Sequence, residues 1–305
     1  MKLLLTRLKQ NPRLIWAFLL TKTPINYLFS DEPYLRLLCW CFLRYRINLK
    51  DPKTFNEKMQ WLKLYAHRPL YAKLADKYAV KEIVKEKLGT DEYLVPCLGV
   101  WDRAEDIDFD ALPDKFVLKC THNSGGGSYI CKDKSKMDFE QVRTQLKKAL
   151  KSDYSRIGRD KQYRDIKPRR IIADMLLDDG SGHELTDYKW WCVNGEPKLM
   201  YITNKGEFVW ENFYDMDFNP VEINHTCPRR KPEYDKPEAF EKMRELATKL
   251  SEGIPFVRID FFYVGGKIYF GEYTFFDWGG LNPFDSYETD LRVGELIQLP
   301  EKTNV

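Results

Sequence analysis

The apolar residues of this chain follow a helical period in some segments and a strand period in others. The helical period predicts four helices, at residues 54–65, 74–88, 138–150 and 237–250. Thr54 and Glu57 have the spacing of a capping box. Gly89 directly follows the last apolar residue of the second helix, as is usual at a helix C-terminus.

Strands are predicted where short apolar runs are separated by turn residues. We expect them at residues 93–100, 116–119, 129–131, 171–177, 188–193, 199–203, 256–264 and 268–276. Asn194 and Gly195 form a strong hairpin signal between two of these strands. The predicted fold class is therefore α+β, with mostly antiparallel pairing in the C-terminal half. The charged and unpatterned residues 152–167 are predicted to form a mobile loop.

The last predicted hairpin carries charged residues inside an aromatic sheet. Arg258 and Asp260 fall on one face of its first strand, and Glu272 and Thr274 share a face of its second strand. A two-residue loop would place Asp260 opposite Gly271, whereas a three-residue loop would place it opposite Glu272. Two carboxylates so close repel unless a cation lies between them. We therefore predict the three-residue loop with Mg²⁺ at this pair, because oxygen ligands suit that ion. The alternative is a solvated face on which Arg258 neutralises both acids.

A glycine-rich loop joins two of the predicted strands. It contains Ser124, Gly125, Gly126 and Gly127, and Lys119 ends the strand before it. Glycines let backbone N–H groups approach a phosphate, and the lysine would add a positive charge. No helix begins directly after the loop, so it is neither a P-loop nor a dinucleotide-binding fingerprint. Taken alone, the loop is better explained as an ordinary glycine-rich hairpin.

Composition excludes several classes of protein. Of the 305 residues, 43% are hydrophobic and 31% are charged, which excludes wholesale disorder. The formal net charge of +3 excludes an overwhelmingly basic nucleic-acid coat protein, and we expect no nucleic-acid partner. The seven cysteines include no C-x-x-C pair, which argues against a disulfide framework and a structural zinc site. We therefore expect a cytoplasmic protein.

The first 50 residues differ from the rest of the chain. They contain nine Lys and Arg residues against only Asp31 and Glu32, interleaved with large apolar side chains. A basic amphipathic helix lying on the cytoplasmic face of an anionic membrane has this composition. The same composition fits equally well a helical arm that packs on its own domain and keeps its basic groups in solvent. The chain contains no apolar run long enough to span a bilayer.

Six motifs occur in an order that resembles the ATP-grasp superfamily, and specifically its TupA-like branch from surface-polysaccharide gene clusters. The resemblance extends from about Asp51 to the C-terminus. The motifs lie at residues 54–61, 75–81, 116–127, 187–189, 257–262 and 271–276. Any one of them is weak evidence, but six in this order are specific.

This resemblance implies an ATP-grasp fold in which a small lid and a larger antiparallel catalytic sheet hold a nucleotide between them. Arg258 and Lys189 are the implied catalytic residues. Thr274 stands where the family commonly has Asn, so Asn282 or water is the alternative third metal ligand. The implied cofactor-binding residues are Lys77, Lys119, Ser124, Gly125, Gly126, Gly127, Asp174, Met175, Leu176 and Lys189, and the implied metal ligands are Asp260, Glu272 and Thr274.

The resemblance also implies the activity and the division of the chain. We expect an ATP-dependent carboxylate–amine ligase that uses ATP and Mg²⁺ and works through an acyl phosphate. Its expected substrates are a uronic acid of a surface glycan or its precursor and an amino acid or other amine. The expected parts are a basic arm (1–50), a helical and α/β subdomain (51–112), a lid subdomain (113–177) and a catalytic subdomain (178–305).

Three alternative functions remain open at the level of sequence. A glycosyltransferase would need a D-x-D metal motif, which Asp215 and Asp217 supply, although two other such patterns occur in the chain. An ATP-grasp kinase would stop after phosphorylation. A non-catalytic scaffold at the membrane would use the basic N-terminal arm.

Overall fold

The computed structural model describes residues 11–303, apart from 125–126, 183, 205–208 and 226. The α-helices of this part are α2 (Leu14–Lys22), α3 (Asp31–Leu43), α4 (Phe55–Tyr65), α5 (Leu70–Ala75), α6 (Ala79–Leu88), α7 (Phe139–Lys151), α8 (Ser155–Gly158), α9 (Lys161–Arg164), α10 (Phe240–Ser251) and α11 (Tyr287–Glu295). Short 3₁₀ turns are η1 (Pro24–Leu28), η2 (Ala104–Asp106), η3 (Lys134–Lys136) and η4 (Asp277–Gly280).

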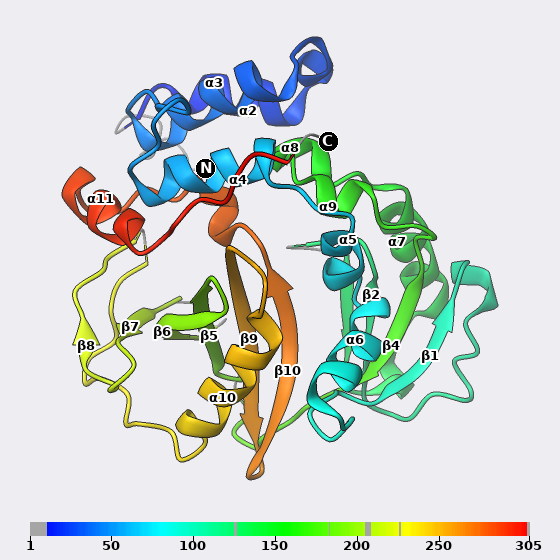
Figure 1. The fold of residues 1–305 in the computed structure, drawn as a ribbon. Helices are drawn as coiled ribbons and strands as arrows, with labels where there is room; N and C mark the ends of the chain where they lie inside the picture. Colours follow the sequence, from blue (N-terminus) through cyan, green and yellow to red (C-terminus); the bar gives the residue numbers. More distant parts are fainter. Residues whose placement is uncertain (1–10, 125–126, 183, 205–208, 226, 304–305) are drawn as a thin grey trace.

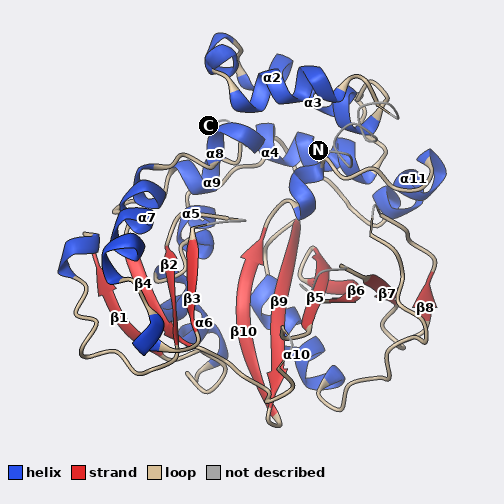
Figure 2. Cartoon of the chain, turned by 180° about the vertical axis from the view of Figure 1, so that it is seen from behind, coloured by secondary structure: helices blue, strands red, loops and turns tan. Residues whose placement is uncertain are grey.

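The strands are β1 (Cys97–Trp101), β2 (Phe116–Cys120), β3 (Ser128–Cys131), β4 (Ile171–Met175), β5 (Asp187–Val193), β6 (Glu196–Thr203), β7 (Glu211–Tyr214), β8 (Pro220–Val221), β9 (Phe256–Val264) and β10 (Lys267–Thr274). They form two antiparallel sheets that stand side by side (Figures 1 and 2). The smaller sheet has the order β1-β4-β2-β3 and the larger one β10-β9-β5-β6-β7-β8. This architecture confirms the predicted α+β class. The smaller sheet includes β1, which lies on the N-terminal side of the expected subdomain boundary at residue 112.

Both faces of the larger sheet are covered. Side chains alternate along a strand, so Trp190 and Trp191 of β5 point to opposite faces. Trp190 packs against Phe240 of α10, with ring centroids 5.0 Å apart, and Trp191 stacks on Phe55 of α4 at 4.7 Å. Both indoles are almost completely buried. These two tryptophans are therefore core residues that hold the helices to the sheet.

The hairpin of β9 and β10 does not have the predicted three-residue loop. Val264 pairs with Lys267, so the loop consists of Gly265 and Gly266, with φ angles of +57° and +77°. Two consecutive positive φ angles are the geometry of a tight two-residue hairpin turn, which glycine adopts without steric cost. The predicted register was wrong, because the sequence has two glycines suited to that turn.

A β-bulge nevertheless places Glu272 opposite Asp260, which is the pairing predicted from the sequence with a different loop length. The register shifts between Phe270 and Glu272, so that Glu272 lies opposite Asp260. The residue at the bulge is Gly271, where a Cβ atom would lie 3.1 Å from the carbonyl oxygen of Asp260. A residue without a side chain allows this close approach, and the bulge turns Glu272 to the same side as Asp260.

One short segment connects the two sheets at the end of the space between them. The carbonyl of Tyr93 accepts a hydrogen bond from the Phe270 N–H of the larger sheet at 2.7 Å. The carbonyl of Pro96 accepts one from the Met175 N–H of the smaller sheet at 2.9 Å. Residues 93–96 are thus bonded to both sheets.

The prediction of a mobile loop at residues 152–167 was wrong. This segment contains α8 and α9, and Tyr163 in it is buried in the main core. Lys63 of α4, which is buried, holds it in place by donating to the Gly158 carbonyl at 2.9 Å and forming an ion pair with Asp160 at 3.0 Å. These contacts come from a distant part of the chain, so the local sequence pattern does not reveal them.

The N-terminal arm packs as a separate helical layer. α2 and α3 lie against each other above α4 (Figure 1) and share a small core that includes Leu20, Leu35 and Leu38. Residues 1–10 of the predicted arm lie outside the described part. Among the helices described, none has the length and apolar character needed to cross a membrane.

Candidate active site

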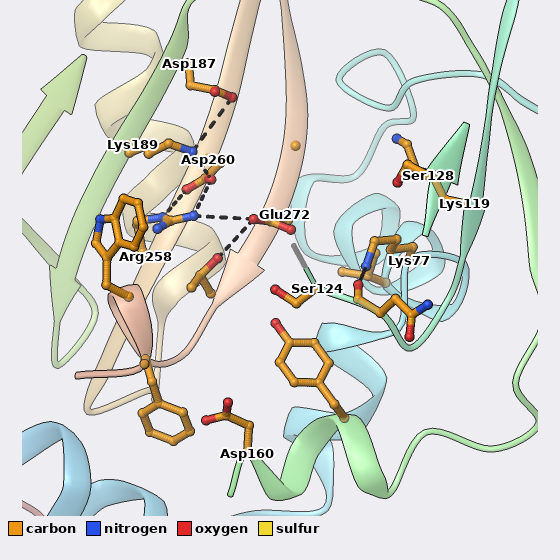
Figure 3. A pocket seen from close by; sticks show the side chains of 18 of the residues that line it. Lys77, Lys119, Ser124, Ser128, Asp160, Asp187, Lys189, Arg258, Asp260 and Glu272 are labelled. Atoms are coloured by element: carbon orange, nitrogen blue, oxygen red, sulfur yellow. Dashed lines mark hydrogen bonds and ion pairs between the residues drawn. The ribbon is translucent and has the colours of Figure 1, made fainter. Parts of the chain in front are cut away.

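A cavity of about 740 Å³ lies between the two sheets, and residues of both sheets and of α8 and α9 line it (Figure 3). Nine of the residues predicted to form the site line it: Lys77, Lys119, Ser124, Asp174, Lys189, Arg258, Asp260, Glu272 and Thr274. Gly127, Met175, Leu176 and Asn282 do not line it, and Gly125 and Gly126 lie outside the described residues. The N–H of Met175 is already used by the Pro96 carbonyl.

Arg258 is the centre of the charged network on the larger sheet. Its Nε donates to Asp260 Oδ1 at 2.7 Å and its Nη2 to Asp260 Oδ2 at 2.7 Å, so the two side chains form a bidentate pair. Nη2 also donates to Glu272 Oε1 at 3.3 Å. Lys189 Nζ lies 2.6 Å from Asp260 Oδ2. As in the alternative prediction, Arg258 contacts both acids, but the face is not solvated, because Arg258 and Asp260 are buried. Both carboxylates face the same cavity, as the metal hypothesis requires (Figure 3).

These neighbours determine the charge of Asp260. Burial by itself acts to raise the pKa of this carboxyl, but the charges of Arg258 and Lys189 outweigh burial and hold the pKa at about 2. Asp260 is therefore a carboxylate at neutral pH. Glu272 is much more accessible, with 42% of its side chain exposed, and the Thr274 hydroxyl donates to its Oε1 at 3.2 Å.

The donor set on this wall fits Mg²⁺, although it does not form a closed metal cage. The described residues contain no group of three or more His, Cys, Asp or Glu side chains arranged to hold a metal ion. Mg²⁺ is usually held by one or two carboxylates together with substrate phosphates and water, not by protein groups alone. Asp260 and Glu272 supply such a pair, with Arg258 as the present counter-charge of both. Whether Thr274 is a third ligand stays a prediction.

The opposite wall of the cavity is cationic. Lys119 and Lys81 share the buried carboxylate of Asp174, at 3.2 Å and 3.0 Å. Lys77 Nζ donates to the Asn123 carbonyl, and burial lowers the pKa of Lys77 below its usual value. Three lysines against one aspartate leave a net charge of +2 on this wall. Asp174, which the resemblance implied to be a cofactor-binding residue, forms ion pairs with two lysines.

Sequence reasoning missed Asp277. This residue is buried and accepts hydrogen bonds from Trp191 Nε1 at 2.9 Å and from the Tyr201 hydroxyl at 3.2 Å, and it also forms an ion pair with Arg258 Nη1. It fixes the guanidinium from the side away from Asp260. The position of Asp277 just after the motif at 271–276 could have identified it as a site residue. No sequence pattern identifies Tyr201.

A half-exposed tryptophan lines the cavity. Trp278 is 50% exposed and has a left-handed backbone with φ +47°. Its indole N–H donates to Glu211 Oε1 at 3.1 Å. A non-glycine residue in this conformation is strained, and such strain is common at functional sites.

The D-x-D pair lies elsewhere. Neither Asp215 nor Asp217 lines the cavity. Asp215 Oδ1 instead accepts from the backbone N–H groups of Asp217 and Asn219, at 3.0 Å and 2.8 Å. Hydrogen bonds to backbone N–H groups two and four residues ahead are those of a turn-forming aspartate. Asp215 thus stabilises the turn between β7 and β8.

Comparison with known proteins assigns a family. The model of the TupA-like ATP-grasp family matches residues 57–298. No curated protein matches the chain in sequence.

Among solved structures, the chain is similar to D-alanine–D-alanine ligase from Helicobacter pylori, with 15% identity, a TM-score of 0.48, and coverage of 80% of this chain and 69% of that one. It is also similar to D-alanine–D-alanine ligase from Bacillus anthracis complexed with ATP, with 12% identity, a TM-score of 0.41, and coverage of 72% and 55%. A third similar structure is the ATP-grasp ligase PsnB with a minimal precursor, Mg and ADP, with 10% identity, a TM-score of 0.37, and coverage of 72% and 57%. The chain thus spans little more than half the length of the last two.

Proposed function

The chain belongs to the TupA-like ATP-grasp family, and from this premise we propose that it is an ATP-dependent carboxylate–amine ligase with ATP and Mg²⁺ as cofactors. One observation carries the proposal. A single cavity has a lysine-rich wall, formed by Lys119 of β2 with Lys77 and Lys81 at α6, and the network of Arg258, Asp260 and Glu272 on the larger sheet. This is the arrangement needed to hold a triphosphate between cations and a carboxylate-bound metal ion.

The proposed reaction has two balanced steps. A substrate carboxylate oxygen attacks the γ-phosphorus of ATP, the bond from that phosphorus to the bridging oxygen breaks, and ADP leaves. An amine then attacks the acyl carbon of the resulting acyl phosphate, phosphate leaves with the C–O electron pair, and the amine gives up a proton. Mg²⁺ would supply charge neutralisation at the phosphates, held by Asp260 and Glu272.

The side chains of the cavity have distinct parts in this chemistry. Lys77, Lys81 and Lys119 bind phosphate oxygens, and their surplus of two charges partly neutralises the roughly four negative charges of ATP. Arg258 presents donors held in a fixed orientation by Asp260 and Asp277. Donors that need no reorganisation stabilise the charge that develops during phosphoryl transfer most effectively.

For the substrates, we propose a uronic acid of a surface glycan or its precursor as the carboxylate and an amino acid as the amine. Membership of the TupA-like branch supports this choice. The half-exposed Trp278 indole that lines the cavity supports it further, since an aromatic face suits the apolar face of a sugar ring. An ATP-grasp kinase would use the same residues and would stop at the acyl phosphate or a phosphate ester.

The test is a phosphate-release assay with ATP and Mg²⁺ in which uronic-acid acceptors are paired with amino acids. We expect release that requires both substrates, and a product mass equal to the sum of both minus water. Formation of ADP without release of inorganic phosphate, with a product heavier by one phosphoryl group, would favour the kinase.

A matched pair of variants distinguishes the loss of a lysine in the cavity from the loss of a lysine elsewhere on the surface. Lys119→Ala removes a cation from the cavity wall, whereas Lys115→Ala removes an exposed one paired with Asp178. We expect Lys119→Ala to reduce the increase in melting temperature caused by ATP and Mg²⁺, and Lys115→Ala to leave it unchanged. An equal response of both variants would contradict nucleotide binding in this cavity.

A further inference from the structure

The N-terminal arm exposes an apolar surface that its packing does not explain. We call this surface the arm patch and define it by Ile15, Trp16, Phe18, Ile25, Tyr27 and Leu28, whose exposed fractions are 53%, 56%, 60%, 43%, 63% and 81%. All six residues lie within fourteen consecutive positions of α2 and η1. Exposed apolar residues scattered singly are normal, but a cluster of this kind usually marks an interaction surface.

The arm patch lies on the outside of the molecule. α2 buries Ala17 and Leu20 against α3, while Ile15, Trp16 and Phe18 of the same helix point away from that core. α2 and α3 form the layer farthest from the two sheets in Figure 1. A helix that is apolar on its outer side as well as on its packed side is expected to contact a second apolar surface.

The charges around the arm patch are positive. Residues 11–30 contain no Asp or Glu, and they contain Arg13 and the exposed Lys22. The nearest acids along the chain are both paired, Asp31 with Arg159 at 3.4 Å and Glu32 with Arg36 at 2.8 Å. In sequence, residues 1–10 add three further basic residues and no acid. A partner for this surface therefore has to be apolar in its interior and anionic at its surface.

We propose that the arm patch docks on a lipid bilayer that contains anionic headgroups. Trp16, Phe18 and Leu28 would insert at the boundary between headgroups and acyl chains, and Lys22 would face lipid phosphates. Trp and Tyr side chains are favoured at this depth because their rings are apolar and carry one polar group. The proposal does not depend on the ligase activity.

Docking would also fix the position of the cavity. The Tyr34 hydroxyl of the arm donates to the Ile157 carbonyl at 3.0 Å, and Arg159 donates to the Asn26 carbonyl at 2.6 Å. Ile157 and Gly158 of the same segment line the cavity. The arm is therefore joined directly to one wall of the site, so that a docked arm fixes the orientation of the cavity relative to the lipid surface.

The test is co-sedimentation of the full chain with vesicles of phosphatidylcholine alone or mixed with phosphatidylglycerol. We expect binding to the mixed vesicles that weakens as salt is added, and little binding to phosphatidylcholine alone. In Trp16→Ser/Leu28→Ser, two large apolar anchors are lost, and binding should fall at least about tenfold. The control Leu98→Ser/Ile130→Ser changes two exposed apolar residues of the smaller sheet and should bind as the wild type does.

Lys22→Glu provides a second variant that keeps the apolar surface intact, and it should weaken binding to the mixed vesicles several-fold. Failure of the wild type to bind mixed vesicles would overturn the proposal. Equal binding by wild type and the double variant at the arm patch would do the same. So would a concentration-dependent dimer in light scattering that the double variant abolishes, since the arm patch would then be an interface between copies of this chain.

Discussion

Glu272 lies opposite Asp260 because the register of β9 and β10 shifts by one residue at Gly271. The turn at Gly265 and Gly266 alone would place Asp260 opposite Gly271. The bulge therefore brings the two carboxylates to one side of the sheet, where Arg258 reaches both.

The first prediction concerns this bulge. A Cβ at Gly271 would lie 3.1 Å from the Asp260 carbonyl oxygen and 3.3 Å from its Cβ, so Gly271→Val forces the strands apart. We expect a loss of about 1–3 kcal/mol in the free energy of unfolding and a loss of stabilisation by ATP and Mg²⁺. Denaturant unfolding with and without ligand measures both. As a control, Gly265→Asn in the same hairpin has open space and a residue type that accepts its φ of +57°, and it should behave like the wild type.

The second prediction concerns the guanidinium of Arg258. Arg258→Lys keeps the positive charge but loses the bidentate contact with Asp260 and the contacts with Asp277 and Tyr201. We expect kcat for phosphate release to fall about a hundredfold or more. Arg244→Lys, on the exposed side of α10, is the matched control and should retain activity. Retention of most activity by Arg258→Lys would show that charge alone suffices at this position.

The third prediction concerns the strained backbone of Trp278. Trp278→Gly and Trp278→Ala both lose the hydrogen bond to Glu211. The difference between their free energies of unfolding therefore measures the cost of the backbone conformation. Because φ is +47°, the glycine variant should be more stable than the alanine variant by about 1 kcal/mol. At Phe276, where φ is −133°, the order should reverse. Chemical denaturation of the four variants measures this, and the same order at both positions would contradict the strain.

The fourth prediction concerns His122 at the base of the glycine-rich loop. This side chain lies next to the Ser152 carbonyl, is only 1% exposed, and burial lowers its pKa to about 4. In the unfolded chain the pKa is about 6.5, so between this pH and pH 4 the unfolded chain binds a proton that the folded chain does not. The contribution of His122 to the free energy of unfolding is therefore complete above pH 6.5 and is lost as the pH falls toward 4. The full difference corresponds to about 3 kcal/mol.

His122→Gln should remove this part of the pH dependence. Unfolding free energies of wild type and variant, measured across this pH range, should converge as the pH falls. Parallel curves would show that His122 does not titrate differently in the folded and unfolded chains.

The elements that the sequence predicted well are those fixed by local chemistry. Thr54 accepts from the Glu57 N–H and Glu57 accepts from the Thr54 N–H, as the capping box requires. Asn194 and Gly195 form the expected two-residue turn, with φ angles of +51° and +85°. The two-residue turn sets the register at the end of the next hairpin, but the shift at Gly271 could not be predicted in this way, because it depends on packing across the strands and not on the turn residues.

The candidate site shows the same division. Motif positions located Lys77, Lys119, Arg258, Asp260 and Glu272 on the walls of one cavity. They did not reveal the anchors of these residues. Asp277 reaches Arg258 and Lys63 reaches Asp160 through contacts between distant segments, and such contacts leave no periodic trace in the sequence.

The short segment of residues 93–96 has a mechanical consequence. Its carbonyls are bonded to both β10 and β4, so the two sheets cannot separate at that end without breaking these bonds. A movement that widened the cavity while keeping both bonds would leave Tyr93 next to Phe270 and Pro96 next to Met175. Opening of the cavity would then be a rotation of one sheet relative to the other about residues 93–96.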